Sequence, residues 1–219
     1  PIAHEDAYFT NNFISNVDYA STADFNRNLT IVNISSDAFR GGLILNSRLT
    51  NIDSGVLGYH ADIWQFFGEP KKNRIMYGLY ATDAHYQGIF MRHNTSIDAA
   101  QRDIALVNNV FELRPIIMSD GVASDCGITR LCDRSNMHNQ WNHLVMWHNT
   151  FIGHGFTGGA NRDGTEQFYD ASIIGNVFVN FIPSFTNDGR VEVNWTLPGN
   201  PNNNEFIHNH YYNATTDSP

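Results

Sequence analysis

Groups able to transfer protons or bind sugars gather in the stretch GYHADIWQFFG, residues 58–68. It carries an imidazole at His60, a carboxylate at Asp62 and an indole at Trp64. Imidazoles and carboxylates can act as general acids or bases, and an indole ring can stack on a sugar ring. If the stretch is a strand with alternating side chains and Ile63 faces the core, these three groups lie together on the outer face. The alternative interpretation is that a loop covers Trp64, with His60 and Asp62 holding that loop in place.

The elements that would position these groups are indicated by asparagine, which is unusually frequent. It accounts for 27 of the 219 residues. It is poor in ordinary helices and strands, so its excess requires an architecture that uses it. Short apolar runs with asparagine near the middle or end recur at 29–35, 42–47, 104–113, 144–153, 172–181 and 205–213. Asparagine tolerates the left-handed backbone of a tight bend, and its amide can bond to the next asparagine in a stack. The runs therefore predict a solenoid of stacked strands.

The runs NNVFEL, HNTFIG, GNVFVN and HNHYYN resemble the coils of right-handed parallel β-helix proteins, the pectate-lyase-like superfamily, from about residue 10 to 213. The resemblance implies an all-β, right-handed parallel β-helix, a solenoid of about six or seven coils with loop insertions. We expect a single domain over residues 1–219, either whole or as a fragment of a larger protein. Because a solenoid exposes strand edges at its ends, we expect a homo-oligomer or a longer parent chain.

The resemblance implies extracellular or cell-surface work on a polysaccharide or another glycan. In the implied register His60 lies beside Tyr86, Ile63 beside Ile89 and Gln65 beside Met91. The predicted catalytic residues are His60, Asp62, Tyr86, Arg92 and His93. The predicted substrate-binding residues are Trp64, Gln65, Gln87 and Asp120. Arg92 would neutralise a substrate carboxylate while a histidine or tyrosine acts as base or acid; alternatively, Arg92 forms a structural ion pair with Asp62 or Asp120.

Two classes of function remain open for this surface. The first, which the gathering of histidine, acid, tyrosine and arginine favours, is a polysaccharide-active enzyme. Lyase- or epimerase-like chemistry is favoured over hydrolysis because a glycosidase needs two carboxyl groups and Asp62 is the one clear acid. The second is a non-catalytic glycan-binding or surface-attachment module of the tailspike or adhesin type. The triplet GHG at 153–155 lacks the paired aspartates of polygalacturonases, and the characteristic pattern of pectate lyases is absent. The resemblance therefore leaves the chemistry open.

Charge excludes some partners. Thirteen Lys and Arg residues stand against 22 Asp and Glu residues, a formal net charge of -9, which argues against nucleic acid and anionic membranes. No apolar run approaches the roughly 18 residues of a membrane span.

The two cysteines and two acidic residues complete the set of candidates. Cys126 and Cys132 predict a disulfide, which would contribute about 2–3 kcal/mol and indicates an oxidising compartment. Free thiols are the alternative, since two ligands do not complete a zinc site. No metal or cofactor is expected; calcium at Asp163 and Glu166 is the alternative, although the spacing of a calcium loop is lacking.

Overall fold

The computed structural model describes residues 8–52, 61–68, 72–84, 88–93, 101–113, 129–130, 141–154, 156–157, 168–182 and 205–212. Within these residues the chain forms strands and no helix, and the sheets are built from parallel pairs such as β1 with β3 and β11 with β14. The all-β, parallel architecture expected from the sequence is therefore confirmed. No helix in this described part is long and apolar enough to cross a membrane.

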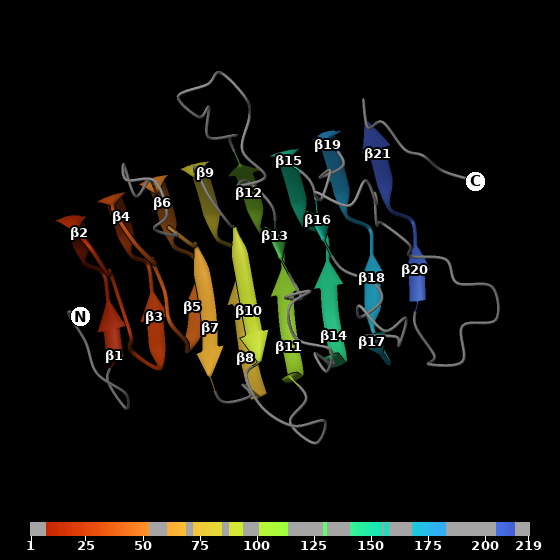
Figure 1. Cartoon of the computed structure of the whole chain (residues 1–219), viewed down its shortest axis with the longest axis horizontal. Helices are drawn as coiled ribbons and strands as arrows, with labels where there is room; N and C mark the ends of the chain where they lie inside the picture. The colour runs from red at the N-terminus through yellow and green to blue at the C-terminus, as the bar shows by residue number, and fades with distance from the viewer. Residues whose placement is uncertain are drawn as a thin grey trace.

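Three sheets contain these strands (Figure 1). The nine-stranded sheet has the order β1 (Tyr8–Thr10), β3 (Phe25–Arg27), β5 (Leu43–Leu45), β8 (Lys72–Tyr77), β11 (Gln101–Val107), β14 (Trp141–Trp147), β18 (Ser172–Ile174) and β20 (Glu205–Ile207), with β17 (Phe168–Tyr169) also paired to β14. The eight-stranded sheet has the order β2 (Phe13–Val17), β4 (Thr30–Ile34), β6 (Arg48–Ile52), β9 (Tyr80–Ala84), β12 (Val110–Leu113), β15 (Thr150–His154), β19 (Val177–Ile182) and β21 (His210–Tyr212). The four-stranded sheet has the order β16 (Phe156–Thr157), β13 (Thr129–Arg130), β10 (Ile89–His93) and β7 (Trp64–Gly68).

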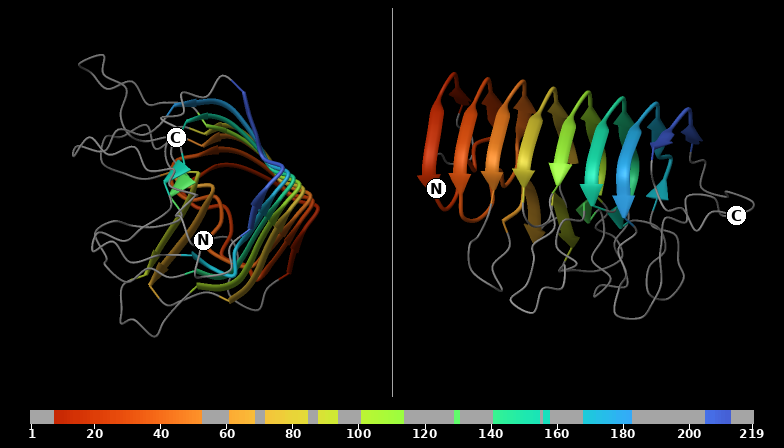
Figure 2. Two further views of the ribbon diagram at one scale, coloured as in Figure 1. Left: turned by 90° about the vertical axis from the view of Figure 1, so that its right-hand side faces the viewer. Right: turned by 90° about the horizontal axis from the view of Figure 1, so that it is seen from above.

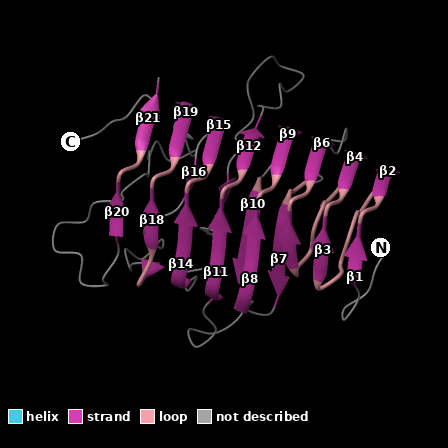
Figure 3. Cartoon of the chain, turned by 180° about the vertical axis from the view of Figure 1, so that it is seen from behind, coloured by secondary structure: helices cyan, strands magenta, loops and turns pink. Residues whose placement is uncertain are grey.

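The two larger sheets are joined by short bends that repeat along the chain. Eight times a strand of the nine-stranded sheet is followed, after two residues, by a strand of the eight-stranded sheet; we call each such unit a bent pair. The bends line up where the two sheets meet (Figure 2), and Figure 3 shows the pairs side by side from behind. The chain thus stacks its bent pairs in sequence order, from β1–β2 to β20–β21.

The first residue of every bend has a left-handed backbone. These residues are Asn11, Asn28, Asn46, Gly78, Asn108, His148, Gly175 and His208. Asparagine and glycine adopt positive φ at low cost, so the left-handed asparagine bends expected from the sequence are confirmed. At Gly175 (φ 65°) an added Cβ would lie 2.7 Å from Nδ1 of His148. The missing side chain therefore leaves room for the imidazole of the preceding bend.

Four of the six asparagine-containing runs, at 104–113, 144–153, 172–181 and 205–213, span a bent pair rather than one strand, whereas 29–35 and 42–47 each cover one strand and part of a bend. The run at 104–113, for example, spans β11, the bend at Asn108 and β12. The described residues contain eight bent pairs, whereas the sequence predicts about six or seven coils. The pair formed by β1 and β2 lies before the first run that the pattern identifies. The pattern misses this pair because its outward residues Tyr8 and Phe13 are aromatic rather than aliphatic.

Inward side chains stack in rows that follow the strand register. In the eight-stranded sheet, Phe111 pairs with Phe151, and Phe151 pairs with Phe178. Their ring centroids are 5.1 and 5.3 Å apart and the rings are nearly parallel. Such aromatic pairs contribute about 0.5–1.5 kcal/mol beyond the burial of their area. The phenylalanine stack thus ties three successive bent pairs together in the core.

A ladder of asparagines occupies the second bend position of the last described pairs. Nδ2 of Asn109 donates to Oδ1 of Asn149 at 2.8 Å, and Nδ2 of Asn149 donates to Oδ1 of Asn176 at 2.9 Å. Nδ2 of Asn176 continues the ladder to Asn209 at 3.0 Å. The Asn149 amide also donates to the carbonyl oxygen of Leu106 at 2.8 Å. Because buried polar groups require partners, the ladder fixes the register between neighbouring pairs.

The four-stranded sheet continues a row of buried residues on a third side of the molecule. Ser21 pairs with Phe39, Phe39 with Trp64, and Trp64 with Ile89. The predicted register is therefore wrong by one residue, since Ile89 lies opposite Trp64 rather than Ile63 and Gln65 lies opposite Phe90 rather than Met91. The N–H groups of Ile63 and Trp64 both donate to the carbonyl oxygen of Gly88, at 2.8 and 3.1 Å. Because two successive residues share one acceptor, an extra residue immediately before β7 shifts the register by one position.

Candidate functional site

The predicted outward strip is not formed at Asp62 and Trp64. Both residues are 0% exposed, as are Ala61 and Ile63 beside them. Side chains alternate between two faces only within a strand, and β7 begins at Trp64, so the alternation does not extend back to Asp62. The expected solvent-facing orientation of Asp62 and Trp64 is therefore wrong. Burial of Trp64 is the outcome that the alternative interpretation of this stretch predicts.

Other predicted residues lie outside the described part of the chain. They are His60, Tyr86, Gln87, Asp120, Cys126, Cys132, Asp163 and Glu166. Arg92 and His93 belong to β10, where their backbones pair with Phe67 and Gly68. The roles assigned to all of these residues stay predictions.

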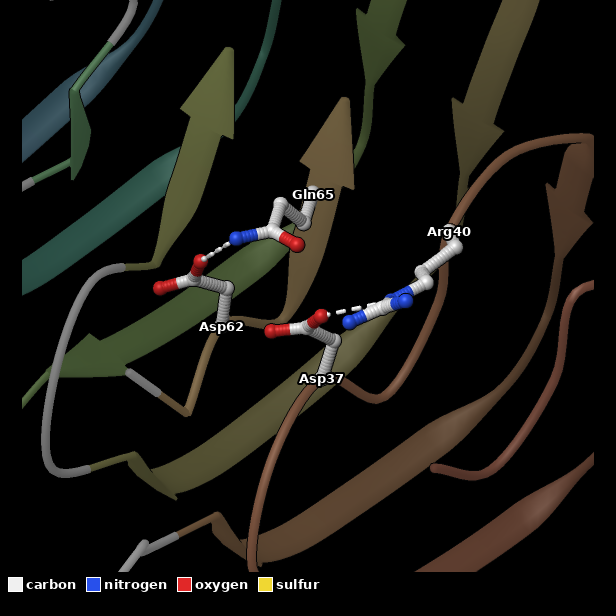
Figure 4. Close-up of polar contacts among 4 residues, drawn as sticks. All are labelled: Asp37, Arg40, Asp62 and Gln65. Atoms are coloured by element: carbon white, nitrogen blue, oxygen red, sulfur yellow. Dashed lines mark hydrogen bonds and ion pairs between the residues drawn. The ribbon is translucent and has the colours of Figure 1, made fainter. Parts of the chain in front are cut away.

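Two carboxylates on the third side each bind a side chain three residues further along. Nε of Arg40 donates to Oδ2 of Asp37 at 2.8 Å, and Nε2 of Gln65 donates to Oδ2 of Asp62 at 3.0 Å (Figure 4). Asp37 is 2% exposed, so both carboxylates are buried. The sequence shows this repetition as DAFR at 37–40 and DIWQ at 62–65. Each carboxylate therefore acts as a fixed anchor for a more exposed side chain.

The stacking of the chain places the two anchored side chains beside each other. Phe39 and Trp64 form a parallel bridge, and the N–H of Gln65 donates to the carbonyl oxygen of Phe39 at 2.9 Å. Arg40 and Gln65 follow these paired residues, so they occupy equivalent positions about 4.8 Å apart along the stack. We call the set Tyr19, Asp37, Arg40, Asp62 and Gln65 the third-side cluster.

Arg40 is held from two directions. Its guanidinium carbon lies 4.0 Å from the centroid of the Tyr19 ring, while Asp37 holds Nε. The Arg40 side chain is nevertheless 43% exposed. A guanidinium has five N–H donors, and no hydrogen bond links the terminal amino groups of Arg40 to another described residue. The paired terminal N–H groups are thus open to a ligand while the group itself is fixed.

The chemistry of the third-side cluster follows from this arrangement. The fork of an arginine matches the two oxygens of a carboxylate, and such bonds are stronger than those between neutral groups. The Gln65 amide donates one N–H to Asp62, which leaves its oxygen able to accept from a hydroxyl group. Asp37 and Asp62 position these groups rather than facing a ligand themselves. Sequence reasoning assigned Gln65 to binding but missed Arg40, whose signal is the repetition of DAFR and DIWQ.

A second polar cluster lies on the outer face of the nine-stranded sheet. Nδ1 of His143 is 2.9 Å from Oδ1 of Asp103, and its Nε2 is 3.7 Å from Oδ2 of Asp170. The three side chains are at least half exposed, and exposed ion pairs contribute little to stability. Across the described residues, His, Cys, Asp and Glu form no group of three or more that could hold a metal ion.

The fold and the third-side cluster define an all-β protein with stacked parallel strands. Comparison of the chain with protein-family models, with curated proteins and with solved structures found no match.

Proposed function

We propose that the chain is a right-handed parallel β-helix of the pectate-lyase-like kind, working outside the cell or at its surface, whose third side recognises an acidic polysaccharide. The bent pairs, the asparagine ladder and the third sheet support a solenoid of this type. Such a stack repeats its surface at every strand, about each 4.8 Å. A surface that repeats along one direction suits a ligand that is itself a linear repeat.

The observation that carries the proposal is the state of Arg40. Its guanidinium is held by Asp37 and by the Tyr19 ring, while its terminal N–H groups remain open. A side chain that is already fixed loses little conformational entropy on binding. A uronic-acid carboxylate would receive two N–H bonds from Arg40, and a neighbouring sugar hydroxyl would donate to Gln65. Recognition therefore needs no carboxylate of the protein to face the sugar.

Lyase- or epimerase-like catalysis is the second candidate function. Such chemistry requires that the charge of the substrate carboxylate is neutralised and that a base removes a proton. Arg40 would supply the first requirement, in the role that the sequence pattern gives to Arg92. His60, Tyr86 and His93 are the predicted bases, and Asp62 becomes a positioning residue. Non-catalytic binding leads because it rests on Arg40 and Gln65 alone.

The test is to replace Arg40 with glutamine and to measure affinity for polysaccharides. The panel contains polygalacturonate and alginate, which carry carboxylates, and a neutral galactan and glucan. The wild-type protein is expected to bind a carboxylate-bearing polymer more tightly than its neutral counterpart. Arg40→Gln should weaken that binding roughly tenfold to a hundredfold, because hydrogen bonds to charged groups contribute about 1.5–3 kcal/mol.

Arg48→Gln is the matched control. Arg48 also lies over a tyrosine, 5.5 Å from the centroid of Tyr80, and is exposed on the eight-stranded sheet. Its substitution removes the same charge from a different side, so it should leave the affinity nearly unchanged. Equal losses for both variants, or tighter binding of the neutral polymers, would contradict the proposal. New unsaturated products in the same mixtures would favour the lyase function over binding alone.

A further inference from the structure

The outward positions of the third side form one column that follows the stack. The backbone of Phe90 pairs with that of Gln65 on one side and with that of Arg130 on the other. Arg130 in turn pairs with Thr157, and Arg40 occupies the position before Gln65. Figure 1 shows β7, β10 and β13 in this order along the stack. We call these five positions the outward column.

The neighbouring column faces the core, which identifies the outer one. Phe39, Trp64 and Ile89 each lie one residue before a member of the outward column, and all three are 0% exposed. Successive residues of a strand belong to opposite faces, so the positions that follow these three belong to the outer face. Arg40 is 43% exposed and Gln65 is half-buried, in agreement with this assignment.

Arginines outnumber accessible carboxylates on this side of the molecule. Five described segments build it, at 37–40, 61–68, 88–93, 129–130 and 156–157. Their arginines are Arg40, Arg92 and Arg130, and their acids are Asp37 and Asp62. Both acids are buried. A chain with a formal net charge of -9 thus carries a cationic strip here, which suits an anionic partner.

The spacing of two of these arginines matches that of a polymer. Arg40 and Arg130 lie in the same column, three strands apart, which separates the two positions by about 14 Å along the stack. Each sugar of an extended 1,4-linked chain adds a length close to one strand spacing. In such a chain with a three-fold screw, every third carboxylate projects on the same side. The column therefore places arginines at the interval at which a polyuronate of this kind places carboxylates.

We propose that Arg130 is a second carboxylate-binding residue, and that an acidic polysaccharide lies along the outward column with its sugars in register with the strands. This role of Arg130 rests on the proposed recognition of such a polymer at Arg40. The carboxylate of one sugar meets Arg40, and that of the third sugar further along meets Arg130. The two sugars between them lie over Gln65 and Phe90, whose residue types suit a hydroxyl group and the face of a sugar ring. A tetramer is therefore the shortest oligosaccharide that reaches both arginines.

Arg92 occupies the competing position for a second carboxylate. It follows Phe90 by two residues on β10, which displaces it about 7 Å to the side of the column. It is also two strands from Arg40 rather than three. A ligand that follows the column passes beside Arg92, whereas Arg130 lies in its path. The two positions require different minimum ligands, a trimer for Arg92 and a tetramer for Arg130.

Calorimetric titration with oligogalacturonates of two to six sugars tests the spacing. The affinity of the wild-type protein is expected to rise about tenfold from the trimer to the tetramer, because the second charged contact forms within an existing complex. Arg130→Gln should remove this rise and leave the binding of the dimer and trimer nearly unchanged. Arg130→Lys should retain part of the rise, because it keeps the charge but not the fork. Arg48→Gln is the matched control on the eight-stranded sheet and should keep the full rise.

The results distinguish a failure of this role from a failure of the proposed function. A wild-type protein that binds no oligogalacturonate would overturn both. Equal affinity for all lengths, with Arg130→Gln identical to the wild type, would leave recognition at Arg40 standing and overturn the role of Arg130. A rise that occurs already at the trimer and is lost in Arg92→Gln would overturn it in favour of Arg92.

Discussion

At the residue scale, the position of Arg40 depends on two contacts of different strength. A cation over an exposed aromatic ring gains about 0.5–1 kcal/mol. A buried carboxylate that loses its partner costs more, about 1–3 kcal/mol. The bond from Arg40 to Asp37 is therefore the stronger constraint, and the contact with the Tyr19 ring is the weaker one. In the proposed recognition, Asp37 is a positioning residue that acts through Arg40.

Asp62→Asn tests whether this carboxylate is a buried anchor. Asp62 is 0% exposed and accepts from Gln65, so the substitution should lower the free energy of unfolding by about 1–3 kcal/mol. The measurement is chemical denaturation followed by circular dichroism. Asp103→Asn is the control, because Asp103 is 50% exposed in its pair with His143 and its substitution should cost less than about 1 kcal/mol. Equal stability of Asp62→Asn and the wild type would contradict the role of Asp62 as a buried anchor.

Sequence reasoning recognised the chemistry of these residues better than their orientation. It selected the stretch around Asp62 because acid, amide and indole groups gather there, and Gln65 does belong to the third-side cluster. It predicted the wrong orientation for Asp62, because alternation gives an orientation only inside a strand and β7 begins after Asp62, at Trp64. Arg40 was missed because its neighbours Asp37 and Phe39 are not unusual until the fold stacks them beside Asp62 and Trp64.

At the scale of the elements, the asparagine ladder stabilises the stack through bonds in both directions. Oδ1 of Asn149 accepts from the N–H and the side chain of Asn109, at 3.1 and 2.8 Å. Its Nδ2 donates to Leu106 and to Asn176. One side chain thus satisfies buried groups in the bent pairs on either side.

Asn149→Ala is expected to lower the free energy of unfolding by about 3 kcal/mol, the upper end for a stranded buried group, because several groups lose their partner together. Asn33→Gly is the control. Asn33 belongs to an exposed ladder with Asn16 and Asn51, and glycine keeps its left-handed backbone (φ 58°) without strain. Thermal melting of both variants distinguishes the two ladders. A similar loss of stability in both variants would mean that burial does not determine how much an asparagine ladder stabilises the fold.

The bends were predictable because asparagine is a known left-handed residue and recurs between apolar runs. His148 and His208 occupy the same bend position with φ values of 54° and 56°. Histidine is enriched at positive φ, as asparagine is, but the sequence contains 10 histidines, so the residue type alone does not place these two in bends. Their backbone follows from the pairs stacked on either side. The sequence therefore predicts that the bends exist, while neighbouring pairs decide which other residues adopt them.

At the scale of the whole molecule, the parallel stack was predictable and its exposed face was not. β14 is apolar on both faces, with Leu144 and Met146 buried in the core and Val145 and Trp147 directed outward. A pattern of alternating polarity is needed to tell core from surface. The third-side register was mispredicted by one residue, because Ile63 and Trp64 both donate to the carbonyl oxygen of Gly88 immediately before β7. Repetition thus reveals the stack, whereas the surfaces depend on side chains that only the fold brings together.

The measurement that tests polysaccharide recognition most directly is nuclear magnetic resonance of the arginine side chains. The protein, labelled with ¹⁵N, is titrated with an oligogalacturonate and, separately, with a neutral galactan oligomer. The acidic oligomer should shift the Nε–H signal of Arg40 and the side-chain amide signals of Gln65, with Arg48 unmoved as an internal control. The neutral oligomer should shift them far less. Saturating oligogalacturonate that leaves Arg40 unchanged, or that shifts Arg48 equally, would contradict recognition at the third side.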